Sequence, residues 1–312
     1  MGSSSSHSIS AYDYMRDFRV TKLRSNLVTY ENYDIGCSNR HRAKIIHYTC
    51  TGPREEPFVR FVVHNPRSEY TQNLYHAMEE VYSLFQTAWL LGLNLSNVEL
   101  VLVRPYKILP RLQELFKLTV AKVSIRSHFE GCHVQPLRAC AGSYLPYTWS
   151  YRQTMQPDAL SLDLRRLLRS KLPLCCEAYQ KNRSLLMTRR HARSRMLRRV
   201  GFFHGCMRSE GHTMVFEGLS QMTMVKQIQL VAESYAVLGP HGAGLTLSMF
   251  LPRGGALVEV TDSLRSKTMG RSVHNIYRNL ALMTDHYYYS ISTNEKNCDR
   301  IRHALRNSMS TV

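Results

Sequence analysis

The sequence lacks three features by which membrane, zinc-binding and common nucleotide-binding proteins are most easily recognised. It contains no run of about 18 apolar residues, so no segment is predicted to cross a membrane as a helix. Its eight cysteines include no Cys-x-x-Cys pair, which argues against a structural metal site and leaves disulfide pairing open. Neither G-x-G-x-x-G nor G-x-x-x-x-G-K-[ST] occurs, so the standard dinucleotide and P-loop motifs are excluded.

Acidic residues are also scarce. The 312 residues include 23 Asp and Glu against 41 Lys and Arg, which gives a formal net charge of +18. A surplus of this size favours an anionic partner, such as a nucleic acid, an acidic lipid or a phosphate-bearing substrate, and charge alone does not choose among them. The remaining composition, 44% hydrophobic and 21% charged, is that of a globular protein.

Apolar periodicity alternates along the chain between the patterns of strands and helices. Residues 58–65 predict a strand, residues 73–92 an amphipathic helix capped near Asn73, and residues 98–105 a second strand. The alternation continues with strands at 184–190, 212–219, 235–239, 256–260 and 285–291, and with helices at 161–172, 220–234, 244–252 and 273–284. This order predicts an α/β fold with parallel sheets.

Residues 133–159 are rich in aromatic residues, proline and small residues, and we predict loops and a domain boundary there. The chain then divides into a leader and extension at 1–57, a first α/β half at 58–158 and a second half at 159–312. Residues 1–57 contain no recognisable signal anchor.

The most glycine-rich turn of the chain, "VLGPHGAGLTLS", contains His241. It joins a predicted strand to a predicted helix, where backbone amides and the helix dipole favour an anion. The end of a strand is also where open α/β sheets bind ligands. His241 is therefore a candidate ligand-binding residue, although such a histidine can also be satisfied by neighbouring backbone alone.

A second candidate site is the arginine-rich segment "LLMTRRHARSRMLRR", which begins with a predicted strand. The planar guanidinium suits bidentate contacts to phosphate. The segment has two interpretations, a nucleic-acid or import-signal patch or a small anion-binding pocket that uses one or two of the arginines.

The third candidate is a pair on the predicted helix 73–92, His76 and Glu80. Spaced at i and i+4, they lie on one helix face, where a histidine can act as a general base and a carboxylate can orient it. A pair of this kind is also common as a local surface contact.

Taken together, these three elements resemble glycosyltransferase family 61, also known as domain of unknown function 563. The resemblance rests on "NLYHAMEEVYSLF", on "MTRRHARSRML" and on "VAESYAVLGPHGAGLTLSMFLPRGGALVEV". Members share an N-x-x-H-x-x-x-[DE] helix, a strand leading to paired arginines, and an H-G-A-G-L-T turn followed by F-L-P-x-G-A and a strand ending in glutamate. The family includes plant xylosyl- and arabinosyltransferases and animal enzymes that add N-acetylglucosamine to O-mannose glycans or to EGF-type repeats.

The resemblance implies a GT-B-like fold, in which two Rossmann-like halves with parallel sheets face a cleft. It implies an inverting transfer, without metal or other cofactor, of N-acetylglucosamine or a pentose such as xylose from a UDP-sugar to a hydroxyl of a glycan or glycoprotein. The family works in the Golgi or endoplasmic reticulum lumen. The implied donor-binding residues are Arg189, Arg190, Arg195, His241, Gly242, Ala243, Gly244 and Glu259.

The implied base on the first half is His76 or Glu80, and the motif does not decide between them. After Arg195 the sequence departs from the family, since "MLRRVGFFHG" stands where an acidic helix is usual, and we expect that helix to be shortened or lost. This departure keeps a non-catalytic nucleotide- or glycan-binding relative as the alternative. A basic nucleic-acid-binding protein is the less favoured third interpretation.

Overall fold

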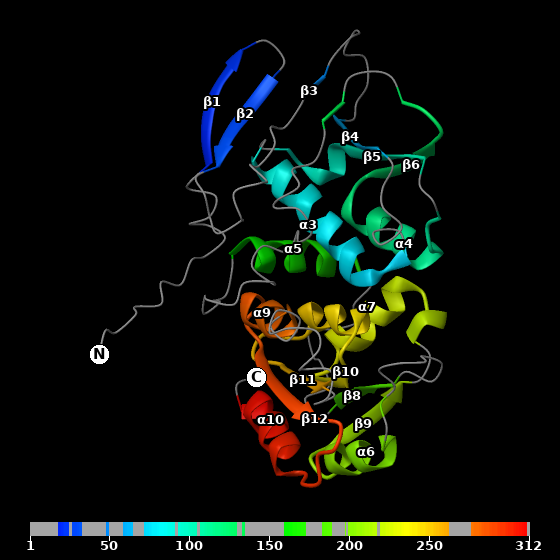
Figure 1. Cartoon of the computed structure of the whole chain (residues 1–312), viewed down its shortest axis with the longest axis vertical. Coiled ribbons are helices and arrows are strands. Elements are labelled where there is room, and N and C mark those ends of the chain that lie inside the picture. The colour runs from blue at the N-terminus through cyan, green and yellow to red at the C-terminus, as the bar shows by residue number, and fades with distance from the viewer. Residues whose placement is uncertain are drawn as a thin grey trace, which may run out of the picture. The chain divides into compact units, whose positions relative to one another are not determined.

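The computed structural model describes residues 18–24, 27–32, 48–49, 59–64, 72–90, 93–104, 107–129, 133–134, 159–172, 183–188, 197, 199–216, 219–261 and 276–310. The chain divides into two compact units, one of residues 9–146 and one of residues 147–312 together with residues 1–8. We call them the N-terminal and C-terminal units and describe each by itself. Their elements are labelled in Figure 1.

The N-terminal unit contains a five-stranded sheet in the order β3-β7-β4-β5-β6. Strands β4, β5, β6 and β7 are mutually parallel where they pair, and β3 is antiparallel to β7. The strands are β3 Tyr48–Thr49, β4 Val59–His64, β5 Val98–Val103, β6 Lys122–Arg126 and β7 His133–Val134, and an antiparallel hairpin is formed by β1 Phe18–Arg24 and β2 Leu27–Asn32. The helices are α3 Leu74–Leu90, η1 Leu95–Asn97 and α4 Pro110–Thr119.

Helix α3 confirms the amphipathic helix predicted from the sequence. The side-chain oxygen Oδ1 of Asn73 accepts a hydrogen bond from the Tyr75 amide at 3.0 Å, which caps the first turn. Ala77, Met78 and Val81, at three- and four-residue spacing, are fully buried. All six residues of β5 are buried as well, which fits the central strand of a parallel sheet.

The C-terminal unit is built on a second sheet, in the order β12-β11-β10-β8-β9, in which every pair is parallel. Its strands are β8 Arg183–Met187, β9 His212–Phe216, β10 Ala236–Pro240, β11 Ala256–Thr261 and β12 Tyr287–Ser292. Its helices are α5 Ala159–Ser170, α6 Val200–Arg208, η2 Leu219–Gln221, α7 Met224–Ala232, η3 Ala243–Phe250, α9 Ile276–Met283 and α10 Asp299–Ser310.

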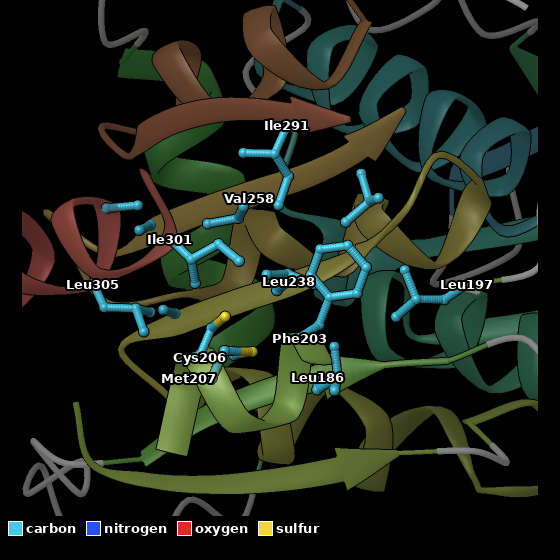
Figure 2. Close-up of a cluster of buried hydrophobic side chains, with 14 of the residues drawn as sticks. Leu186, Leu197, Phe203, Cys206, Met207, Leu238, Val258, Ile291, Ile301 and Leu305 are labelled. Carbon is cyan, nitrogen blue, oxygen red and sulfur yellow. The ribbon is translucent and has the colours of Figure 1, made fainter. Parts of the chain in front are cut away.

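One face of this sheet is covered by α6 and α10, as Figure 2 shows. Leu186, Leu238 and Val258 of three neighbouring strands pack there against Phe203 of α6 and Ile301 of α10, and all five are buried. A disulfide between Cys206 and Cys298 joins α6 to the residue that precedes α10, with a Cα–Cα distance of 5.2 Å. The opposite face, on which Glu259 lies, carries the candidate site.

The predicted α/β class with parallel sheets is confirmed, and each predicted strand and helix named above corresponds to an observed element. After Arg195, where the family's helix was expected to be shortened or lost, the chain forms the nine-residue helix α6. Its apolar residues explain why it persists, since Phe203, Cys206 and Met207 are buried against the sheet. No helix in the part of the chain that the structure describes is long and apolar enough to span a membrane.

Candidate functional site

The candidate site is formed where β10 and β11 end side by side. Residue 241 follows the last residue of β10, and the His241 amide donates to the Val260 carbonyl of β11 at 3.1 Å. Glu259 pairs in register with Gly239, so its side chain lies beside the turn. Nδ1 of His241 is hydrogen-bonded to Oε1 of the fully buried Glu259. The glutamate of the F-L-P-x-G-A strand thus contacts the histidine of the glycine turn directly.

The second carboxylate oxygen of Glu259 is also bonded. The Tyr288 hydroxyl, from the edge strand β12, donates to Oε2 at 2.5 Å. Burial, reinforced by the negative charge of Glu259, raises the pKa of Tyr288, so the phenol keeps the proton that it donates. Tyr288 of β12, Glu259 of β11 and His241 in the turn after β10 therefore form a continuous hydrogen-bonded chain, which we call the His241 triad.

The triad fixes the tautomer of His241. Since Glu259 is a carboxylate that can only accept, Nδ1 carries the proton of this hydrogen bond, and Nε2 is the nitrogen available for a further partner. The His241 ring also packs edge-on against Tyr277 of α9, at 5.1 Å between ring centroids. His241 remains partly exposed, with 18% of its side chain accessible. A fixed ring in a partly exposed side chain can bind a ligand atom through Nε2.

The glycines of the turn bring η3 close to the sheet. A Cβ on Gly239 would lie 3.1 Å from Leu245 Cδ2 and 3.1 Å from Met187 Cβ, so a larger residue would push η3 away from β10 and β8. Gly242 caps the amino end of η3. In the described part of the chain the amides of Gly242, Ala243 and Gly244 have no acceptor, as is usual for the first turn of a helix. They are donors for an anion beside His241.

The predicted arginines cannot be placed against this site. Arg189, Arg190 and Arg195 lie outside the described residues. The strand before them, β8, ends at Met187 and is the direct neighbour of β10. Their participation stays a prediction.

On the N-terminal unit, the structure changes the partner of His76. Nδ1 of His76 is hydrogen-bonded to Oε2 of Glu79 at 2.6 Å, so the carboxylate at i+3 holds the ring, where the sequence analysis paired it with Glu80 at i+4. Both glutamates are buried, and a quarter of the His76 side chain is accessible. Because a carboxylate only accepts, Nδ1 donates in this contact, and Nε2 is the ring nitrogen at which a proton can be taken up.

Three residues of these arrangements were not predicted from the sequence. Glu79 is the neighbour of the predicted Glu80. At i+3 from His76 it fits the helical spacing as well as Glu80 does at i+4. Tyr288, 29 residues beyond Glu259, reaches it because β12 lies beside β11, and Tyr277 of α9, 18 residues beyond Glu259, packs against the His241 ring. Within the described residues, no three His, Cys, Asp or Glu side chains are grouped as metal ligands.

A protein-family model matches the sequence. The sequence model of glycosyltransferase 61 matches residues 74–258, which include α3 with His76 and the whole His241 turn. The match covers more than half of the chain, and the protein belongs to glycosyltransferase family 61. It is thus a glycosyltransferase by family, for which a sugar donor and a glycan acceptor are the general partners. No curated protein is significantly similar to the sequence.

Proposed function

We propose that this protein is an inverting, metal-independent glycosyltransferase that transfers a sugar from a UDP-sugar to a hydroxyl of a glycan or glycoprotein. The observation that carries the proposal is the His241 triad at the carboxyl end of β10 and β11, beside the amides of Gly242, Ala243 and Gly244. Ligands of open α/β sheets bind at this end of the strands.

The donor-side chemistry follows from the charge that develops during transfer. As the bond between the anomeric carbon and the phosphate oxygen breaks, UDP leaves with additional negative charge on its diphosphate. Preorganised donors stabilise such charge without a metal. In our proposal the η3 amides and the Nε2–H of a doubly protonated His241 donate to the diphosphate, while Nδ1–H stays bonded to Glu259. Glu259 and Tyr288 hold the ring in place, and Arg189, Arg190 or Arg195 supplies positive charge.

The acceptor-side chemistry requires a base. The acceptor oxygen bonds to the anomeric carbon opposite the leaving UDP, and its proton is transferred to the base as that bond forms. We assign this proton to Nε2 of His76, with Glu79 as the group that orients the ring. Glu80 is the alternative base from the family motif. The GT-B-like cleft between two Rossmann-like halves is part of the same proposal.

The disulfide supports a compartment for this activity. Disulfides form and persist in the secretory pathway and are rare in the reducing cytosol. Because Cys206 and Cys298 are joined, we propose that the protein acts in the lumen of the endoplasmic reticulum or Golgi, where family members work. N-acetylglucosamine and xylose are the first donor sugars to examine.

The test is a donor screen with a metal chelator present, in which UDP release and glycan mass are followed. We expect one UDP-sugar to be consumed by the wild type. We expect His241→Ala to lower turnover about 100-fold or more, the usual effect of removing one preorganised donor. His303→Ala, an exposed histidine of α10, is the matched control and should retain full activity. Wild-type UDP binding without any turnover would instead support the non-catalytic alternative, and absence of UDP binding would refute the proposal.

A further inference from the structure

Helix α5 carries a largely buried arginine, Arg165, that forms no ion pair within the described part of the chain. Arg165 and Arg169, four residues apart, lie on one face of this helix. Nη1 of Arg169 donates to the Phe250 carbonyl at 2.8 Å, so this face packs against the end of η3. Arg165 is 7% exposed. We call the two residues the α5 arginine pair.

Arg165 makes no hydrogen bond and no ion pair with any residue that the structure describes. A guanidinium has five N–H donors, and a buried one is ordinarily satisfied by carboxylates or carbonyls. Leaving a buried charge without a partner is among the most destabilising arrangements in a protein. An arginine of this kind, with no protein acceptor among the described residues, can take an anionic ligand as its partner.

The neighbouring charged groups do not supply that acceptor. Asp285 is close enough to influence Arg165, but its Oδ2 is bound by Arg253 at 2.6 Å. His286 is buried and neutral, since burial and the charge of Arg165 lower its pKa to about 3. Its Nε2–H donates to the Leu251 carbonyl at 3.0 Å. Asp285 therefore forms its ion pair with Arg253 and acts on Arg165 only at longer range, and neither arginine of the α5 pair forms an ion pair with a described residue.

We infer that the α5 arginine pair binds a phosphate-type oxyanion, with the fork of Arg165 as the bidentate ligand and Arg169 as the second cation. The planar guanidinium matches two oxygens of a phosphate or sulfate group, which Lys does not reproduce. Two adjacent positive charges suit a dianion better than a single carboxylate. The ligand is a free phosphate or the phosphate or sulfate group of a larger molecule.

This site is distinct from the His241 triad. His241 follows the carboxyl end of β10, whereas Phe250, Leu251 and His286 precede the amino ends of β11 and β12. Parallel strands place these ends on opposite edges of the sheet. The inference concerns anion binding at the α5 arginine pair and does not depend on the proposed glycosyl transfer.

The test compares phosphate binding by the wild type, Arg165→Met, Arg166→Met and His241→Ala, using thermal shift and calorimetry in a phosphate-free buffer. Arg166 is the matched control, because it is on the same helix with 78% of its side chain exposed. We expect inorganic phosphate to stabilise the wild type and Arg166→Met alike. The phosphate binding that remains in His241→Ala should be the part that depends on Arg165. Arg165→Met should bind phosphate at least about 10-fold more weakly, the equivalent of about 1.4 kcal/mol.

Two further measurements test the same site. If Arg165→Met does not fold, Arg165→Lys keeps the charge without the fork and should still weaken phosphate binding several-fold. UDP and glucose 6-sulfate, compared with inorganic phosphate, distinguish a nucleotide or a sulfated sugar from the free ion as the ligand. Phosphate binding that is lost in His241→Ala and retained in both Arg165 variants would overturn the inference. Equal stabilisation of all variants, or of none, would also overturn it.

Discussion

Glu259 and Tyr288 lie on adjacent parallel strands, and the Tyr288 hydroxyl donates to the carboxylate oxygen that His241 does not use. Each oxygen of the buried carboxylate therefore has one partner. A carboxylate held from both sides cannot rotate away from the histidine. Tyr288 accordingly acts through Glu259 on the orientation of His241, and this gives the first prediction.

Replacing Tyr288 with Phe removes one charge-assisted hydrogen bond to a buried carboxylate, which usually costs about 1.5–3 kcal/mol. We expect turnover to fall roughly 10-fold and the pH profile of turnover to shift, because Glu259 is no longer fixed against His241. Tyr289→Phe is the control, since the Tyr289 hydroxyl contacts Asn307 of α10 on the other face of β12. Steady-state kinetics over pH distinguish the two variants. Equal effects would mean that Tyr288 has only a structural role.

The second prediction separates the two buried glutamates of α3. Glu79→Gln removes the carboxylate that holds Nδ1 of His76, and we expect turnover to fall by roughly 100-fold or more, as when a general base loses its orientation. Glu80→Gln keeps this contact and should reduce turnover by much less. Both variants require a check of folding by circular dichroism, since both positions are buried. A larger loss in Glu80→Gln would identify Glu80 as the base.

Much of the fold could be predicted from the sequence because its periodicity is strong. The short apolar run of β5 is typical of a buried strand, and the three- and four-residue spacing of α3 is typical of an amphipathic helix. Other elements have weaker signals. Strand β6 is mostly exposed, and α10 has few apolar residues, of which Ile301, Ala304 and Leu305 are buried. Such segments are stabilised by packing against or pairing with the rest of the sheet, and these tertiary contacts cannot be predicted from the local sequence.

The site could be predicted only in part, for a related reason. His241 and Glu259 were predicted by resemblance, while their contact depends on the register of β10 with β11. Tyr288 is one of three consecutive tyrosines, and the pleat of β12 decides which of them faces Glu259. Glu79 and Glu80 both lie within reach of His76 on a helix, and the side-chain rotamers decide between them.

The third prediction concerns the disulfide. Cys206 and Cys298 are 92 residues apart, and closing a loop of this length stabilises the folded state by about 4–5 kcal/mol in the chain-entropy estimate. We expect reduction, or the Cys206→Ser and Cys298→Ser double substitution, to lower the free energy of unfolding by an amount of this order. Denaturation with and without reductant measures the loss. The double variant should no longer respond to reductant, and free thiols at both positions in the oxidised wild type would contradict the structure.

The fourth prediction concerns acid stability, through His286. In the folded state Nε2–H donates to the Leu251 carbonyl, and the Thr284 hydroxyl lies 2.8 Å from Nδ1. Burial, together with the charges of Arg165 and Arg169, lowers the pKa of His286 from its ordinary value of 6.5 to about 3. The unfolded chain therefore binds a proton near pH 6.5 that the folded chain binds only near pH 3.

Stability from His286 is fully present above pH 6.5 and is lost as the pH falls toward 3, because protons then favour the unfolded state. One such group contributes a slope of about 1.4 kcal/mol per pH unit between these values. We expect His286→Gln to flatten the dependence of the unfolding free energy on pH across this window, although burial of Gln lowers stability at pH 7. His303→Gln should keep the wild-type slope. Urea denaturation between pH 4 and 7 measures both slopes, and an unchanged slope in His286→Gln would show that other groups cause acid unfolding.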